Sequence, residues 1–320
     1  EGWRAGRRTC DGGVVNKLPT GERDVALVTT EYTLYPYLSA AENMGFGLKL
    51  RRTPQPEVER RVQAEARVLG VRRLLGRRAR TLSSGERQRV AVGRATTRVP
   101  RLFLLDEPLA QLDTHVRAKL RAEFGRLQAG LGVTTLYTTH DQREAMALGH
   151  RMAVLDRGQL QQVAVPQQIY ERPANTMVAT FVGTPSMALI PVELDENGLS
   201  LRAGTLTLRM TDTQRRALRE AGGRRWLLGL RAEHVTTVED STAAAGRRAE
   251  LEVTGVEFLG ALRLVTGALV GGDRATLTAR VRVTNRARPG ERLPVVVDLA
   301  AAHVFDRATG EAVLHGSPST

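Results

Sequence analysis

The stretch RLFLLDEPLAQLD, residues 101–113, decides how the rest of the chain is interpreted. Its four apolar residues, Leu102 to Leu105, predict a short buried strand, and two carboxylates, Asp106 and Glu107, follow directly. Ligands of open α/β sheets bind at the carboxyl ends of the strands. At such an edge Asp106 could hold a Mg²⁺ ion through water, and Glu107 could orient and deprotonate an attacking water. Taken alone, the stretch is equally consistent with a strand that ends in an ordinary acidic turn.

Length and composition bound the class of protein. The 320 residues suggest two domains or one large one, and a hydrophobic fraction of 42% suffices for a packed core. No run is apolar over the roughly eighteen residues that a membrane span needs, and the first residues lack the apolar core of a signal peptide. A single cysteine, Cys10, excludes an internal disulfide in these residues. We therefore expect a soluble, cytoplasmic protein.

The net charge of +13 raises the question of a nucleic-acid partner, because a basic field is typical of phosphate binding. Only Lys17, Lys49 and Lys119 are lysines among 47 basic residues, and the arginines are spread along the chain. Aromatic residues, which would stack on bases, make up only 4%. The composition favours a solvated basic surface, and we expect no nucleic-acid partner.

The first hundred residues predict strands followed by helices. Residues 11–28 have the pattern of strand, turn and strand. The loop TTEYTLYP, residues 29–36, suits a partner contact and simple loop anchoring equally well. Apolar residues recur at helical spacing in the segments that follow, 41–50 and 57–75. Together with the next helix they predict a helical subdomain over about residues 41–97.

The segment TLSSGERQRVAVGRA, residues 81–95, predicts a well-capped helix. Ser83 and Glu86 form an S-x-x-E capping box, with Gly85 between them. The capping alone explains these residues. The same free N–H groups and positive dipole end could also bind phosphate, so the pattern leaves both functions open.

A second strand is predicted to deliver a candidate residue to the same edge as Asp106. A helix after Asp113 stops near Gly130 and Gly132, and the β-branched residues 133–139 then predict a strand. His140 follows at its carboxyl end. A lone histidine is more often structural than catalytic, but this placement favours a position in the same crevice.

The hydrophobic pattern changes in the last third of the sequence. After a hairpin over residues 152–163, short alternating runs separated by glycines predict many strands and one short helix at residues 211–221. Short strands at near-even spacing suggest a small closed barrel of the oligonucleotide/oligosaccharide-binding (OB) type. We place the domain boundary between residues 182 and 183.

Four segments, LSSGERQRV, LFLLDEP, AQLD and YTTHDQ, in this order and spacing, resemble the ATPase subunits of ABC transporters. RDVALV, EYTLYPYLSAAENMGFGLKL, HDQREAM, QQIYERPAN and FVGTPSM resemble the subgroup that serves importers of sugars, polyols and glycerol phosphate. GLRAEHV, VEFLG and HVFDRATGEAVL resemble the TOBE-type barrel domain of that subgroup. The resemblance covers about residues 12–314.

The resemblance implies an α/β fold with two domains. Residues 1–182 would form an incomplete P-loop NTPase (RecA-like) core with the helical subdomain. Residues 183–320 would form an all-β, OB/TOBE-like regulatory barrel domain. The implied function is that of an ATP-binding, ATP-hydrolysing subunit that couples ATP to the uptake of sugar-like solutes. The alternative is a catalytically silent subunit that contributes its signature motif and its contacts to an intact partner.

The resemblance also assigns roles to single residues. Asp106 resembles the Walker B carboxylate that holds Mg²⁺, and Glu107 resembles the catalytic base. His140 resembles the switch histidine at the γ-phosphate, and Asp113 the D-loop aspartate that crosses the dimer interface. The implied cofactors are ATP and Mg²⁺.

Further residues match partner surfaces of the family. The signature motif completes the ATP site of the partner subunit, so two subunits, identical or different, would sandwich two nucleotides; the matching residues are Ser83, Ser84, Gly85 and Glu86. The region that meets the coupling helices of transmembrane permease subunits contains Tyr32, Leu34, Tyr35, Pro36 and Tyr37. An extracytoplasmic solute-binding protein is an indirect partner. The implied location is the inner face of the cell membrane.

The largest departure from the family pattern is the phosphate loop. No G-x-x-x-x-G-K-[ST] match is present, because Asn16, Leu48 and Ala118 precede the three lysines. We interpret the sequence as truncated, without the first strand, the phosphate loop and the adenine-stacking aromatic residue. Losing three charge-assisted hydrogen bonds to phosphate costs roughly 4.5–9 kcal/mol. The polypeptide as written is therefore expected to bind ATP weakly on its own.

Three further departures lie in the site itself. Thr30 stands where the family carries the Q-loop glutamine and is too short to reach a Mg²⁺ ion, so we expect impaired coupling. Ser84 replaces the first signature glycine and adds a side chain where the backbone approaches phosphate. Glu86 replaces the usual glutamine.

Overall fold

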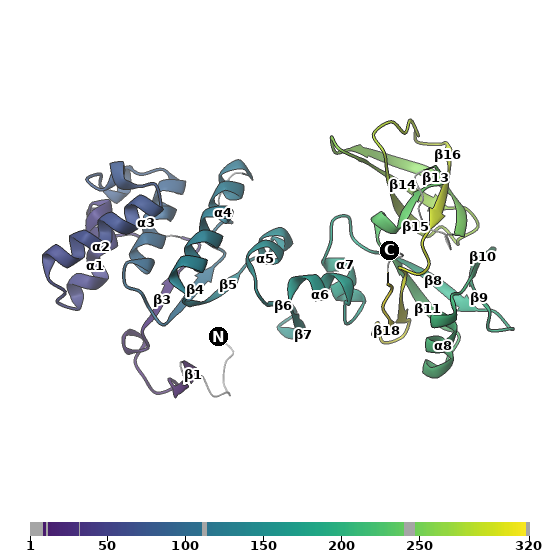
Figure 1. The fold of residues 1–320 in the computed structure, drawn as a ribbon, viewed down its shortest axis with the longest axis horizontal. Coiled ribbons are helices and arrows are strands. Elements are labelled where there is room, and N and C mark those ends of the chain that lie inside the picture. Colours follow the sequence, from purple (N-terminus) through teal and green to yellow (C-terminus); the bar gives the residue numbers. More distant parts are fainter. Residues whose placement is uncertain (1–8, 11, 32, 111–113, 240–246, 318–320) are drawn as a thin grey trace. The chain divides into compact units, whose positions relative to one another are not determined.

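The structure is a computed structural model and describes residues 9–10, 12–31, 33–110, 114–239 and 247–317. The backbone contacts divide the chain into two compact units, Glu1–Leu148 and Gly149–Thr320. Figure 1 labels the elements of both units. The backbone contacts place residues 149–182 in the second unit. The boundary predicted from the change in hydrophobic pattern, at residues 182/183, places them in the first domain.

The first unit is built on a three-stranded parallel sheet, ordered β3-β4-β5. Its strands are β3 (Val25–Val28), β4 (Leu102–Asp106) and β5 (Thr134–Thr138). The predicted strand over residues 102–105 is confirmed and extends by one residue, so that Asp106 is its last member. Two short antiparallel strands, β1 (Thr9–Cys10) and β2 (Gly13–Val14), and the 3-10 turn η1 (Thr20–Glu22) precede β3.

Helices cover one face of this sheet. Ala26, Val28, Phe103 and Leu105 are buried in a cluster with apolar residues of α1 (Ala40–Leu50), α2 (Gln55–Val68) and α3 (Ser84–Thr96). Two 3-10 turns, η2 (Arg72–Leu74) and η3 (Ala79–Thr81), lie between α2 and α3. The predicted helical subdomain is therefore present.

The helix predicted over residues 57–75 ends earlier than expected. Gly70 has a φ of +65°, and the N–H of Val71 donates to the carbonyl of Ala66 at 2.9 Å. This backbone arrangement is a Schellman motif, which only a residue that tolerates positive φ readily forms. The glycine therefore ends the helix even though the apolar spacing continues beyond it.

The last two helices of the first unit, α4 (Thr114–Leu131) and α5 (Gln142–Leu148), follow β4 and β5. Phe124 of α4 meets Tyr137 of β5 edge to face, with ring centroids 6.5 Å apart. This contact is one that aromatic quadrupoles favour, and it holds α4 against the sheet. Among the described helices of the chain, none is long and apolar enough to cross a membrane.

The second unit begins with the predicted hairpin and continues into two antiparallel sheets. The hairpin is β6 (Met152–Asp156) and β7 (Gln159–Ala164), followed by α6 (Pro166–Glu171) and α7 (Thr176–Phe181). The six-stranded sheet has the order β10-β9-β8-β11-β17-β18 and the five-stranded sheet β12-β16-β13-β14-β15.

The strands of the larger sheet are β8 (Ala188–Leu194), β9 (Ser200–Ala203), β10 (Leu206–Arg209), β11 (Arg225–Leu230), β17 (His303–Asp306) and β18 (Ala312–Leu314). Those of the smaller sheet are β12 (Val235–Thr237), β13 (Arg247–Phe258), β14 (Arg263–Leu269), β15 (Thr276–Val281) and β16 (Arg292–Val297). Helix α8 (Asp212–Ala221) connects β10 to β11 within the larger sheet, and the turn η4 (Ala232–His234) leads from β11 to β12 of the smaller sheet. The predicted helix at residues 211–221 is confirmed, with Thr211 as its N-cap.

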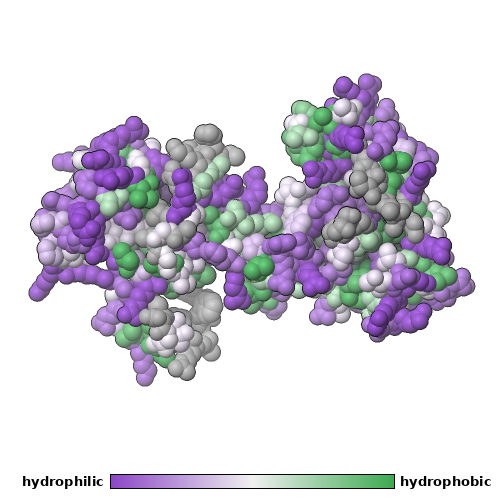
Figure 2. All heavy atoms as spheres, in the orientation of Figure 1, coloured by the Kyte–Doolittle hydropathy of each residue, from purple (hydrophilic) through white to green (hydrophobic). Residues whose placement is uncertain are grey.

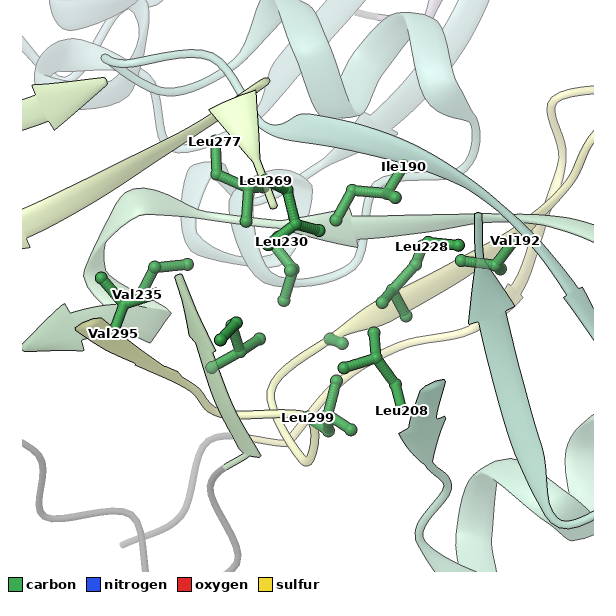
Figure 3. Packing of buried hydrophobic residues seen from close by; sticks show 14 of the residues in the cluster. Ile190, Val192, Leu208, Leu228, Leu230, Val235, Leu269, Leu277, Val295 and Leu299 are labelled. Carbon is green, nitrogen blue, oxygen red and sulfur yellow. The ribbon is translucent and has the colours of Figure 1, made fainter. Parts of the chain in front are cut away.

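The two sheets enclose one apolar core. Ile190 of β8 and Leu230 of β11 lie beside Leu269 of the smaller sheet, and the same cluster contains Val192 and Leu228 (Figure 3). The outer strands β12 and β15 of the smaller sheet contact each other, so this sheet is nearly closed into a barrel. The expected fold class, an α/β nucleotide-binding core followed by an OB/TOBE-like β domain, is confirmed by this arrangement together with the comparisons given below.

Candidate functional site

The candidate site lies at the carboxyl ends of the three parallel strands. Asp106 of β4 is paired in register with Thr138 of β5, so Glu107 and His140 leave the sheet at the same edge. Thr30, two residues after β3, donates its hydroxyl to the main-chain oxygen of Asp106 at 3.4 Å. The expected convergence of Asp106, Glu107 and His140 is found.

Thr138 holds the two carboxylate residues in place. Its hydroxyl donates to Oδ1 of Asp106 at 2.7 Å, and the N–H of Glu107 lies 3.1 Å from both its carbonyl oxygen and its Oγ1. The sequence analysis did not single out this residue. The signal was present in the pairing of the two predicted strands, because parallel register sets Thr138 opposite Asp106.

Glu107 and His140 form a pair on the solvent side of this edge. Nδ1 of His140 lies 3.3 Å from Oε1 of Glu107, with the side chains 68% and 39% exposed. Glu107 has a φ of +44°, a conformation that is uncommon outside glycine and that collects at functional sites. The bonds from its N–H to Thr138 offset this strain and aim the carboxylate outward.

A buried network fixes the loop that carries His140. Tyr137 and Thr139 donate their hydroxyls to Oε2 of Glu144 at 3.0 and 2.8 Å, and the N–H of Asp141 donates to Oγ1 of Thr139 at 2.9 Å. Glu144 is 3% exposed, and the Arg117 guanidinium lies 3.9 Å from it. His140 therefore projects from a segment whose flanking residues are tied down on both sides.

The predicted signature residues lie at the exposed start of α3. Oγ of Ser83 accepts from the N–H of Glu86 at 3.3 Å, and the Glu86 carboxylate accepts from the N–H of Ser83 at 2.9 Å. The latter bond lowers the pKa of Glu86. Ser83 and Ser84 are exposed, and Gly85 is half-buried. The capping box is formed, and the helix start remains accessible from outside the subunit.

Helix α3 is also tied to the acidic strand. The amide of Gln88, which is fully buried, donates to the carbonyl oxygen of Pro108, immediately after Glu107. This hydrogen bond joins helix α3 to the segment that carries Glu107. Gln88, too, was not among those predicted from the sequence.

The expected partner-contact loop is exposed but anchored. The side-chain amide of Asn43 donates to the carbonyl of Tyr35 at 3.1 Å and accepts from its N–H at 2.9 Å. Tyr35 and Tyr37 are 44% and 75% exposed, while Leu34 is half-buried and Pro36 exposed. Two predicted residues, Tyr32 and Asp113, lie outside the described residues.

The oxygen atoms at this edge suit a Mg²⁺ ion. Asp106 is exposed, its carboxylate accepts from the Thr138 hydroxyl, and the Thr30 hydroxyl donates to its main-chain oxygen. Mg²⁺ prefers oxygen ligands, keeps several waters and is held by one or two carboxylates plus phosphate oxygens. Within the described parts of the chain, no group of three or more His, Cys, Asp or Glu residues is placed to hold a metal ion.

Comparison with known proteins identifies the family. Residues 3–110 match the ABC transporter model, residues 183–235 the MalK OB fold domain and residues 228–305 the TOBE domain. Over 305 residues the chain is 43% identical to the trehalose/maltose import ATP-binding protein MalK of Thermococcus litoralis. That alignment covers 92% of this chain and 80% of the relative.

The chain belongs to the ATP-binding proteins of ABC transporters. Two further members of this family are the sn-glycerol-3-phosphate import ATP-binding proteins UgpC. That of Burkholderia thailandensis is 43% identical over 303 residues, 94% of this chain and 81% of the relative. That of Cereibacter sphaeroides is 41% identical over 306 residues, 96% of this chain and 83% of the relative. Use of ATP follows from membership of this ATP-binding family.

Proposed function

We propose that this chain is the ATP-binding subunit of an ABC importer and couples ATP binding and hydrolysis to the uptake of sugar-like solutes. The observation that carries the proposal is the Glu107–His140 pair beside Asp106, at the carboxyl edge of a parallel sheet, in a member of this family. The relatives at 40–43% identity are named for import of trehalose and maltose or of sn-glycerol-3-phosphate. This supports polyhydroxylated solutes as the substrate class.

Each of the three residues has a defined task in this proposal. Asp106 would hold Mg²⁺ through water, and the ion supplies positive charge to the phosphates when it is bound. Glu107 orients and deprotonates the attacking water, because its carboxylate is aimed outward beside the ion site. His140, which follows the neighbouring strand β5, contacts the terminal phosphoryl group and positions it for in-line attack.

The same proposal defines the partners. The exposed start of α3 would complete the nucleotide site of a second ABC ATPase subunit, identical or different. The loop around Tyr35 and Tyr37 would receive the permease subunits, so the protein would work in the cytoplasm, peripheral on the inner membrane face. Closure of the dimer around ATP would be transmitted through Gln88 and the acidic strand to this loop.

ATP turnover tests the proposal. A version that carries a phosphate-loop strand and helix ahead of residue 12, with Thr30→Gln, is purified and its ATPase activity is measured with and without permease subunits. We expect activity to depend on the added lysine, because a phosphate-loop lysine makes charge-assisted hydrogen bonds to phosphate. Glu59→Gln, which changes an exposed carboxylate on α2, serves as the control and should keep full activity.

A silent subunit would give a different result. If the grafted protein binds ATP tightly but does not turn it over, while it stimulates hydrolysis by an intact partner subunit, the catalytic proposal is wrong. The signature-donating alternative would then be the correct one. Absence of both effects would exclude the ABC-motor proposal for this chain.

A further inference from the structure

One stretch of the helical subdomain concentrates positive charge without any acidic residue. Between Glu65 and Glu86 the sequence contains only basic ionisable residues. The structure exposes five of them in η2, in η3 and in the turn between the two, and we call this set the arginine strip: Arg72, Arg73, Arg77, Arg78 and Arg80. Hydrophilic residues also dominate the surface drawn over α1 and α2 in Figure 2.

Most of these guanidinium groups are not neutralised by the protein. Arg77 lies 3.9 Å from the Glu86 carboxylate, and Arg80 lies over the ring of Tyr37, 6.0 Å from its centroid. For Arg72, Arg73 and Arg78, the described residues provide no ion-pair partner. A surface with this much unpaired like charge is self-repulsive and gains free energy when an anionic surface approaches it.

Backbone hydrogen bonds hold the strip beside the exposed tyrosine loop. The N–H of Ala79 donates to Leu38 at 3.0 Å, that of Ala40 to Arg77 at 2.8 Å, and that of Arg80 to Pro36 at 3.3 Å. The two segments therefore run side by side. Tyr37, 75% exposed, lies at one end of the strip, between the two loop residues that accept from Ala79 and Arg80, so its ring is exposed beside the last arginines of the strip.

We propose that the arginine strip and Tyr37 bind the headgroups of anionic phospholipids. The planar guanidinium fork matches phosphate geometry, and a basic cluster gains attraction to an anionic leaflet from each charge. Tyrosine is enriched at the headgroup level of membranes because its ring is apolar and its hydroxyl is wet. Lipid is favoured over nucleic acid because the strip adjoins the loop that, in the proposed function, contacts the membrane subunits. This preference for lipid rests on the proposed function, whereas the charge and exposure of the strip do not.

Vesicle binding by the full chain tests the inference without ATP or permease. Co-sedimentation is measured with phosphatidylcholine vesicles and with vesicles that also contain phosphatidylglycerol. We expect binding only to the anionic vesicles and weaker binding at high salt. Replacement of Arg72, Arg73, Arg77 and Arg78 by glutamine should lower the partition coefficient on the order of tenfold or more, since each charge contributes separately. Tyr37→Ala should cause a smaller loss.

Matched variants decide whether the effect is local. The control removes equal charge from exposed arginines of the second unit, and its members are Arg209, Arg219, Arg286 and Arg288. This control should bind as the unchanged chain does. Should the four-arginine variant fold poorly, the pair Arg72→Gln and Arg73→Gln, which leaves the hydrogen bond from Arg77 to Thr81 intact, replaces it.

Three results would overturn the inference. The first is equal loss of vesicle binding in the control, which would show attraction by net charge alone. The second is complete release of the chain from anionic vesicles by millimolar glycerol phosphate, which would show a site for free phosphate. The third is that the four-arginine variant loses binding to duplex DNA but keeps its binding to vesicles, which would show that the strip recognises nucleic acid. Because the vesicle assay needs no nucleotide, its failure leaves the ATPase proposal untouched.

Discussion

At the scale of single residues, Arg231 organises the second unit. It is 2% exposed, and its guanidinium donates to the carbonyl oxygens of Val182 at 2.8 Å and Tyr170 at 2.7 Å. The same group lies 3.7 Å from the ring centroid of Tyr170. Burial lowers the pKa of Arg231, and the ion is compensated by the two carbonyls, the ring and Glu233. Arg231 thus binds the α6–α7 segment to the end of β11.

Arg231→Met is expected to lower the free energy of unfolding by about 2–4 kcal/mol, because the two carbonyl oxygens lose their charged donor. Calorimetry of the second unit measures the loss. Arg225→Met, on the same strand but exposed and paired with Glu193, should change stability by less than about 1 kcal/mol. Equal effects of the two variants would show that Arg231 does not hold the segment.

His303 predicts a pH dependence of stability. Burial, together with the positive charges of the neighbouring Arg231, His315 and His234, lowers the pKa of His303 to about 3. The histidine is therefore neutral in the folded chain, whereas the unfolded chain takes up a proton below the ordinary pKa of 6.5. The stabilisation is complete above pH 6.5 and is lost progressively as pH falls from 6.5 toward 3.

The loss should reach about 2 kcal/mol at pH 5 relative to pH 7.5 for this one group. Urea unfolding at several pH values measures it. His303→Gln should flatten the dependence, whereas His150→Gln, an exposed change in the same unit, should leave it as it is. A dependence unchanged by His303→Gln would contradict the assignment.

The residues that were predictable from sequence are those whose position follows from one strand. Asp106, Glu107 and His140 each follow an apolar run, and parallel strands end at a common edge. Thr138 and Gln88 were missed because their partners, Asp106 and Pro108, lie 32 and 20 residues away. Such pairs depend on strand register and helix packing, which no local pattern specifies.

At the scale of elements, α1 and α3 offer a natural comparison, because both begin with a capping box. Ser39 and Glu42 cap α1 with the same reciprocal hydrogen bonds that Ser83 and Glu86 form on α3. The local S-x-x-E pattern predicted the second correctly, and the first has the same pattern in the sequence. The caps are alike in structure, while only the start of α3 is proposed to meet a nucleotide.

Ser39→Ala and Ser83→Ala should each cost about 1 kcal/mol of stability, because each removes one side-chain acceptor from the first turn. Only Ser83→Ala should also lower ATP turnover by the assembled dimer, since Ser83 is proposed to face the partner's nucleotide. Thermal unfolding and ATPase assays on both variants separate the two effects. Equal ATPase activity in the Ser39→Ala and Ser83→Ala variants would show that Ser83 acts only as a helix cap.

At the scale of the whole molecule, the predicted architecture is confirmed, and the domain boundary at residues 182/183 stays a prediction. The parallel core, the helical subdomain and the β-rich second part were all expected from periodicity and resemblance. Within the β-rich part, residues 200–209 form two antiparallel strands, β9 and β10, because Gly204, with a φ of +59°, turns the chain between them. The contacts of Arg231 with Tyr170 and Val182 explain why residues 149–182 group with the barrel.

This grouping predicts the behaviour of fragments. A fragment of residues 149–320 should unfold at a higher temperature than a fragment of residues 183–320, because the shorter one leaves Arg231 buried without its two carbonyl partners. Circular dichroism of both fragments as a function of temperature provides the comparison. Equal midpoints would favour the boundary at residues 182/183 that the sequence texture indicates.

The central claim is that the edge formed by Asp106, Glu107 and His140 hydrolyses ATP, and single-turnover hydrolysis by the phosphate-loop-carrying protein tests it most directly. Glu107→Gln should slow the chemical step by about 10²–10⁴-fold, because a general base is removed, while ATP binding stays within about threefold of its original strength. Hydrolysis at an unchanged rate in Glu107→Gln would contradict the account.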